Sequence, residues 1–91
     1  VDKAAVRELI REYFQSVQSA SGSRAAEALR SIGNLYANYL GEKDSALAVL
    51  DQAIALGRSD QNFVDRCKLE KGDIFILKEQ PWEASLLYLQ V

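Results

Sequence analysis

The sequence lacks histidine and methionine and has one cysteine, Cys67, and one proline, Pro81. Without histidine there is no Ser–His or Cys–His nucleophile pair, no histidine-ligated metal and no general base of the usual kind near neutral pH. A single cysteine cannot form an internal disulfide or a cysteine-based zinc site. These absences favour a domain that has no catalytic activity and binds no cofactor or metal.

A strong charge of one sign and a long apolar run are also missing. The 91 residues include 11 basic and 13 acidic side chains, for a net charge of −2, which argues against a broad electrostatic contact with nucleic acid. No apolar run approaches the roughly 20 residues that a membrane-spanning helix needs. The composition is that of one folded globular domain. Because the sequence starts at Val1 and has no methionine, we expect it to be part of a longer protein, which leaves its compartment open.

Apolar residues recur every three or four positions along most of the chain. Val6, Ile10 and Val17, for example, fall on one face of a helix. The pattern predicts an all-α fold of about five helices. The predicted helices cover residues 2–18, 24–40, 45–56, 61–78 and 81–91. The short loops between them favour antiparallel packing of successive helices.

Small and polar residues indicate where the helices begin and end. Gly22 suits a left-handed end of the first helix, and Ser23 can cap the second. Gly41 follows the second helix, and Asp44 can cap the third. Pro81 stands where a helix accepts proline, in the first turn of the fifth helix.

Two segments of the chain repeat one pattern, in which a glycine inside a predicted helix is followed by an alanine in the next helix. Gly33 precedes Ala46, and Gly72 precedes Ala84 at almost the same spacing. A glycine inside a helix costs about 1 kcal/mol relative to alanine, so two at matching places indicate a packing need. We expect Gly33 to lie at the closest approach of the second and third helices, facing Ala46.

This pattern resembles the tetratricopeptide repeat (TPR), a helix-turn-helix unit of about 34 residues. The matching residues are Leu29, Ile32, Gly33, Tyr36, Ala46, Leu50 and Ala53 in the first copy and Gly72, Phe75, Ala84, Tyr88 and Val91 in the second. The units would cover residues 24–57 and 60–91, after a leading helix at 1–19. Lys68 and Lys71 depart from the family's large apolar residues. The resemblance implies a right-handed superhelical stack of antiparallel helix pairs.

The resemblance also implies a function. TPR proteins hold a peptide or a partner helix on the concave face of the stack, so the chain would be a non-catalytic scaffold for protein–protein interaction. The alternative is a structural spacer or self-assembly segment with no ligand of its own. The concave-face residues that the resemblance implies are Glu27, Arg30, Asn34, Asn38, Arg66, Leu69 and Asp73.

Arg30 and Asn34 lie one helical turn apart, so both could reach one carboxylate or peptide group. They are similar to half of the family's carboxylate clamp, whose other half needs an asparagine where this chain has Glu70. The alternative is that Arg30 pairs with Glu27 in solvent. Glu70 and Asp73, three positions apart, could share acid and base roles. The alternative there is an ordinary solvated helix face.

The segment from Leu86 to Leu89 places four apolar side chains in succession. Four successive positions span about 300° of a helix, more than one neighbouring helix pair covers. We therefore expect part of this helix to be covered by the next repeat of a longer protein. In the isolated chain we expect Leu86 and Leu89 to form a self-association edge through which copies meet as a homo-oligomer.

Overall fold

The computed structural model describes residues 2–91 of the chain. Its elements in order are α1 (Lys3–Ser19), α2 (Gly22–Leu35), the π-helical turn η1 (Tyr36–Leu40), α3 (Lys43–Leu56), α4 (Gln61–Leu77) and α5 (Pro81–Leu89). No strand occurs among the described residues. The predicted all-α fold with five helices is confirmed.

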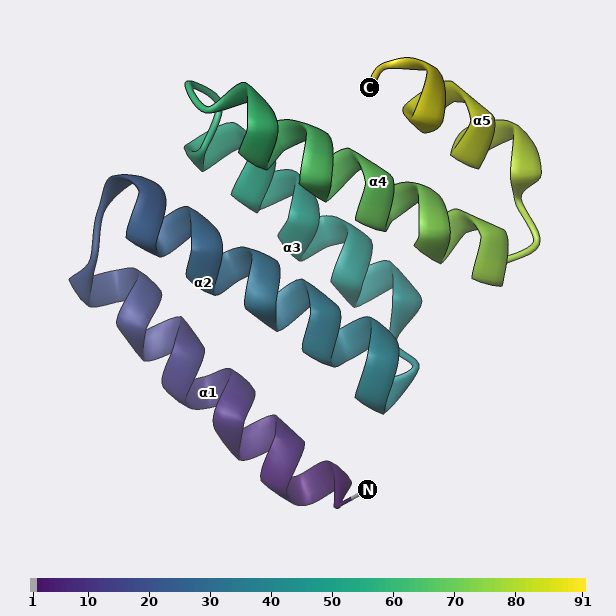
Figure 1. The fold of residues 1–91 in the computed structure, drawn as a ribbon. Helices are drawn as coiled ribbons and strands as arrows, with labels where there is room; N and C mark the ends of the chain where they lie inside the picture. The colour runs from purple at the N-terminus through teal and green to yellow at the C-terminus, as the bar shows by residue number, and fades with distance from the viewer. Residues whose placement is uncertain (1) are drawn as a thin grey trace.

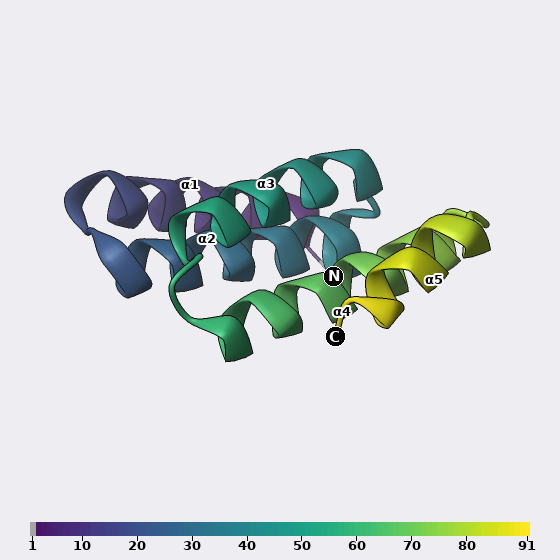
Figure 2. The ribbon, with the colours of Figure 1, turned by 90° about the horizontal axis from the view of Figure 1, so that it is seen from above.

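Successive helices run antiparallel and lie side by side from α1 to α5 (Figure 1). Seen from above, α1 and α3 lie in one layer and α2 and α4 in the other, with α5 beside the far end of α4 (Figure 2). The Cα extents of 34 × 32 × 15 Å describe a slab two helices thick. In such a slab the helices at the two ends, α1 and α5, pack mainly on one neighbour each.

The loop between α1 and α2 differs from the prediction. Gly22 has the expected positive φ of +59°, but it is the first residue of α2 and not the end of the first helix. Ala20, in an extended conformation, ends α1. Ser21 precedes α2, so Ser23 is not its cap. A cap is defined by an extended backbone at one residue, and any of several small polar residues in a row can supply it.

Gly41 follows the second predicted helix as expected, but Asp44 does not cap the next helix. Gly41 has a φ of +66°, and its N–H donates to the carbonyl of Tyr36, which widens the last turn into η1. Glu42 precedes α3, and Asp44 lies in its first turn. Pro81 is the first residue of α5, as predicted.

The core lies where α2, α3 and α4 meet. Ile32, Leu50 and Cys67, one from each helix, are its largest fully buried side chains. A Cβ atom on Gly33 would lie 2.9 Å from Cγ of Leu50 and 3.5 Å from the carbonyl oxygen of Ala46. Gly33 therefore lies at the close approach of α2 and α3, as predicted, although Leu50 is nearer to it than Ala46.

The second helix pair repeats this contact. A Cβ atom on Gly72 would lie 2.9 Å from Cζ of Tyr88. Tyr88 follows Gly72 at almost the spacing at which Leu50 follows Gly33. Ala84, like Ala46 in the first pair, is fully buried. The same glycine contact thus joins α2 to α3 and α4 to α5. The superhelical stacking of a TPR array stays a prediction.

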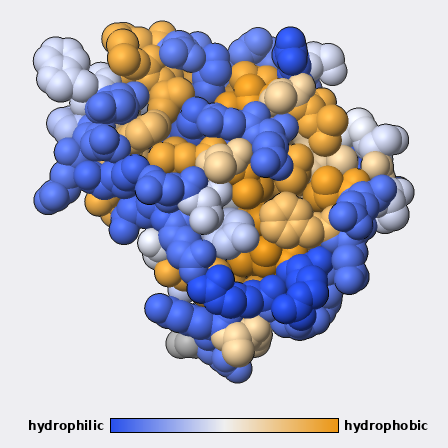
Figure 3. Space-filling model, turned by 180° about the vertical axis from the view of Figure 1, so that it is seen from behind, coloured by the Kyte–Doolittle hydropathy of each residue, from blue (hydrophilic) through white to orange (hydrophobic). Residues whose placement is uncertain are grey.

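The back of the molecule is unevenly covered by polar side chains. Apolar side chains gather in the centre of this face and again at the corner formed by α5, whereas the edge formed by α1 is mostly polar (Figure 3). Within residues 2–91, no helix has the length and the apolar character that crossing a membrane requires.

Candidate functional site

A polar network joins the facing sides of α2 and α4, with Glu70 of α4 at its centre. Nε and Nη2 of Arg30 donate to the two carboxylate oxygens of Glu70 at 2.8 and 3.0 Å. Nδ2 of Asn34 donates to the same carboxylate at 3.0 Å and to the backbone carbonyl of Arg30. Bidentate arginine–carboxylate pairs are among the strongest hydrogen-bonded contacts in proteins. The carboxylate that Arg30 and Asn34 bind is therefore the chain's own.

The network extends to two more of the predicted residues, Glu27 of α2 and Arg66 of α4. The two carboxylate oxygens of Glu27 lie 3.4 Å from Nη1 of Arg30 and 3.4 Å from Nη2 of Arg66. The sequence-based alternative of a pair between Arg30 and Glu27 is thus present, but the contact with Glu70 is shorter and bidentate. The hydrogen bond to Glu70 also raises the pKa of Arg30, which keeps the guanidinium charged.

The remaining predicted concave-face residues lie outside this network. Asn38 is exposed in η1, and Leu69 is exposed on α4. Asp73 accepts a hydrogen bond of 2.7 Å from the hydroxyl of Tyr88, which raises the pKa of that phenol. Glu70 is engaged with α2 and Asp73 with α5, so the two carboxylates do not share one site.

Cys67 lies beneath the network and is fully buried. Burial raises the pKa of its thiol to about 11, and the nearby carboxylate of Glu70 adds to the effect. At neutral pH the thiol is protonated and poorly nucleophilic. Among the described residues, no three His, Cys, Asp or Glu side chains lie close enough together to hold a metal ion.

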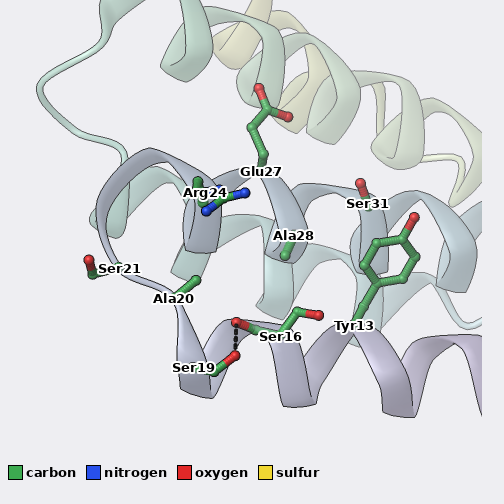
Figure 4. A pocket seen from close by; sticks show the side chains of 9 residues that line it. All are labelled: Tyr13, Ser16, Ser19, Ala20, Ser21, Arg24, Glu27, Ala28 and Ser31. Carbon is green, nitrogen blue, oxygen red and sulfur yellow. Dashed lines mark hydrogen bonds between the residues drawn. The ribbon is translucent and has the colours of Figure 1, made fainter.

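An open pocket of about 610 Å³ lies between α1 and α2 (Figure 4). Tyr13 rises from α1 towards Ser31 of α2, and the hydroxyl of Ser19 donates to the carbonyl of Ser16 at 3.3 Å. The lining residues are Tyr13, Ser16, Ser19, Ala20, Ser21, Arg24, Glu27, Ala28 and Ser31. Small-molecule sites are mostly apolar and enclosed. This hollow is open and lined by hydroxyl groups, so it forms a polar end of the molecule.

The opposite end of the molecule exposes large apolar side chains on α5. Trp82, Leu86 and Leu89 are 80%, 60% and 83% exposed. Their i, i+4, i+7 spacing places them on one face, here called the α5 stripe, while Ala84 and Tyr88 pack on α4. Leu86 and Leu89 of this stripe were predicted from the sequence, whereas Trp82 was not. The signal that could have found it is the step of two helical turns from Trp82 to Leu89.

The helix before α5 adds to this apolar end. Leu69, Ile76 and Leu77 of α4 are exposed, and Ile76 follows Leu69 by two helical turns, on the same face. The exposed apolar residues of the chain are thus concentrated on its last two helices.

Comparisons with protein-family models, with curated proteins and with solved structures find no match to this chain. Its resemblance to the tetratricopeptide repeat stays a prediction based on the residues quoted above.

Proposed function

We propose that the chain is a non-catalytic helical module for protein–protein interaction and that the α5 stripe is its contact surface. The observation that carries the proposal is the exposure of Trp82, Leu86 and Leu89 on one uncharged helix face. Contiguous apolar surface of this kind is uncommon on domains that stay free in water. Tryptophan is also enriched among the residues that contribute most to binding.

The polar network of α2 and α4 supports this choice of surface. The donors of Arg30 and Asn34 are already engaged by Glu70, so an external carboxylate would have to displace an internal one that is favourably placed. A ligand gains little from a site whose hydrogen bonds are satisfied in its absence. The TPR resemblance supports a protein-binding role in general, and the α5 stripe supports this place for it.

Site-specific photo-crosslinking tests the proposal. A photoreactive phenylalanine derivative is placed at position 86 of the α5 stripe and, as a matched control, at Ala48, which is exposed at the corresponding place on α3. After irradiation in the cells that naturally produce the protein, we expect covalent protein adducts from position 86 and few from position 48. Equal yields from the two positions would contradict the proposal and favour a spacer without a partner.

A further inference from the structure

The junction of α3 with α4 reveals what is unusual about α5. Asp51 of α3 forms an ion pair with Lys71 of α4, and Asp44 of α3 forms one with Lys78. At the solvent-exposed edge of this junction α3 therefore carries acidic groups that lysines of α4 pair with, beside the apolar core that the two helices share.

The repeated glycine contact identifies the matching edge of α5. Because Tyr88 matches Leu50, the residues that match Asp44 and Asp51 at the same offset are Trp82 and Leu89. On α3 these positions carry charges that pair with α4, whereas on α5 they carry exposed apolar side chains. Whatever covers the edge of α5 must therefore offer an apolar surface instead of lysines.

We infer that a second copy of this chain covers the α5 stripe, with α5 packed against α5 about a twofold axis. The inference rests on the proposed function and names the partner of the same surface. In a twofold contact each surface meets the same surface of the other copy, so a charged residue near the axis would face a charge of the same sign. The stripe of Trp82, Leu86 and Leu89 carries no charge. Glu83, the one charged residue of α5, directly follows Trp82 and so points away from that face.

The spacing within the stripe also suits a helix–helix contact. Trp82, Leu86 and Leu89 are separated by steps of four and then three positions, which is the apolar period of paired helices. The two copies would bury the tryptophan, the residue type most enriched in strong contacts, on both sides of the axis.

The other end of the molecule makes a head-to-tail arrangement unfavourable. There the hollow between α1 and α2 is lined by the hydroxyls of Ser16 and Ser31 and flanked by Arg24. Packing the α5 stripe on this end would remove those groups from water without giving them hydrogen-bond partners. Copies that meet through like surfaces form a closed dimer, whereas head-to-tail contacts lead to rings or filaments.

Sedimentation equilibrium of the chain, from about 10 µM to about 1 mM, tests the inference. We expect a monomer–dimer equilibrium that stops at the dimer, with a dissociation constant below about 1 mM, as for a small interface. Leu86→Lys together with Leu89→Lys should weaken the dimer by at least about tenfold. Ala48→Lys together with Ala55→Lys adds the same charge to an exposed face of α3 and should leave the dimer unchanged. Circular dichroism checks that both variants keep the parent helix content.

Each contrary result overturns the inference in a recognisable way. A parent chain that stays monomeric at the highest concentration excludes the second copy. A dimer that survives both lysines on α5 places the contact elsewhere, and growth beyond the dimer indicates head-to-tail packing. If the parent is monomeric but photo-crosslinking at position 86 yields adducts with other polypeptides, the proposed function stands and only the identity of the partner is wrong.

Discussion

The two helix pairs, α2 with α3 and α4 with α5, share a glycine contact but differ in how far it is buried. In the first pair Gly33 faces Leu50, which is 0% exposed, and in the second pair Gly72 faces Tyr88, which is 38% exposed. The first pair has α1 on one side and α4 on the other, whereas α5 packs mainly on α4. The same helix contact thus becomes a core contact or a surface contact according to its neighbours, as in repeat structures generally.

The largest expected effect comes from shortening the two facing side chains. Leu50→Ala leaves a cavity among α2, α3 and α4 and should lower the free energy of unfolding by about 2–5 kcal/mol. Tyr88→Ala removes a partly exposed ring and should lower it by about 1 kcal/mol. Urea unfolding followed by circular dichroism measures both. Equal losses would mean that Leu50 and Tyr88 are equally buried at their glycine contacts.

Filling the space at the two glycines should have the next largest effect. Gly33→Leu forces a side chain against the fully buried Leu50 and should destabilise by about 1–3 kcal/mol or more. Gly72→Leu meets the ring of Tyr88, which can rotate into solvent, and the gain in helix propensity of up to about 1 kcal/mol offsets part of the cost.

Thermal melting of the two glycine variants beside the parent chain provides the measurement. A Gly33→Leu variant that melts with the parent would show that the register of the repeat is wrong. A Gly72→Leu variant that melts as low as Gly33→Leu would show that Tyr88 is held more firmly than its exposure indicates.

The network at Glu70 ties the second pair to the first, so its removal should separate them. Glu70→Ala leaves Arg30 without its bidentate partner and should cost about 1–3 kcal/mol, since both side chains are largely buried. Glu70→Gln keeps the volume and part of the hydrogen bonding and should cost less. Arg66→Ala, which breaks the exposed contact with Glu27, is the matched control and should cost under about 1 kcal/mol. A Glu70→Ala loss no larger than that of Arg66→Ala would reduce the network to an ordinary surface contact.

Most of the fold was predictable because apolar periodicity is repeated over many residues. Five helices, the helix end before Gly41 and the first-turn Pro81 follow from patterns that several residues support together. The positions predicted for Ser23 and Asp44 were wrong because a helix cap depends on the backbone of one residue among several similar ones.

The candidate site was less predictable because its contacts cross between helices. The proximity of Arg30 and Asn34 could be read from their spacing of one turn. Whether Arg30 pairs with Glu27 or with Glu70 depends on how closely α2 and α4 approach, which the sequence pattern does not encode. The exposure of Trp82 likewise depends on which neighbours cover α5.

The smallest expected effect concerns alkaline stability, because one acidic group with a raised pKa lies in the core where α4 meets the first pair and another lies at the α4–α5 contact. In Cys67 the pKa is raised from 9.0 to about 11, chiefly by burial. Because the folded state holds this proton more tightly than the unfolded state, the stabilisation is complete below pH 9 and is lost as the pH rises towards 11. The phenol of Tyr88 also has a raised pKa, through its hydrogen bond to Asp73, but its exposure to solvent weakens the effect on stability.

Removing each acidic group shows whether the buried thiol or the partly exposed phenol causes the alkaline loss. The free energy of unfolding is measured by urea titration at several pH values between about 8 and 11 for the parent, Cys67→Ala and Tyr88→Phe. We expect Cys67→Ala to flatten the decline above pH 9 more than Tyr88→Phe does, because only the thiol lies in the fully buried region. The small cavity left by Cys67→Ala lowers the free energy of unfolding by the same amount at every pH, so it does not change the slope against pH that is compared. If Tyr88→Phe flattens the decline more than Cys67→Ala does, the α4–α5 contact excludes water better than the core beneath Glu70, and the order of burial assigned to Cys67 and Tyr88 is reversed.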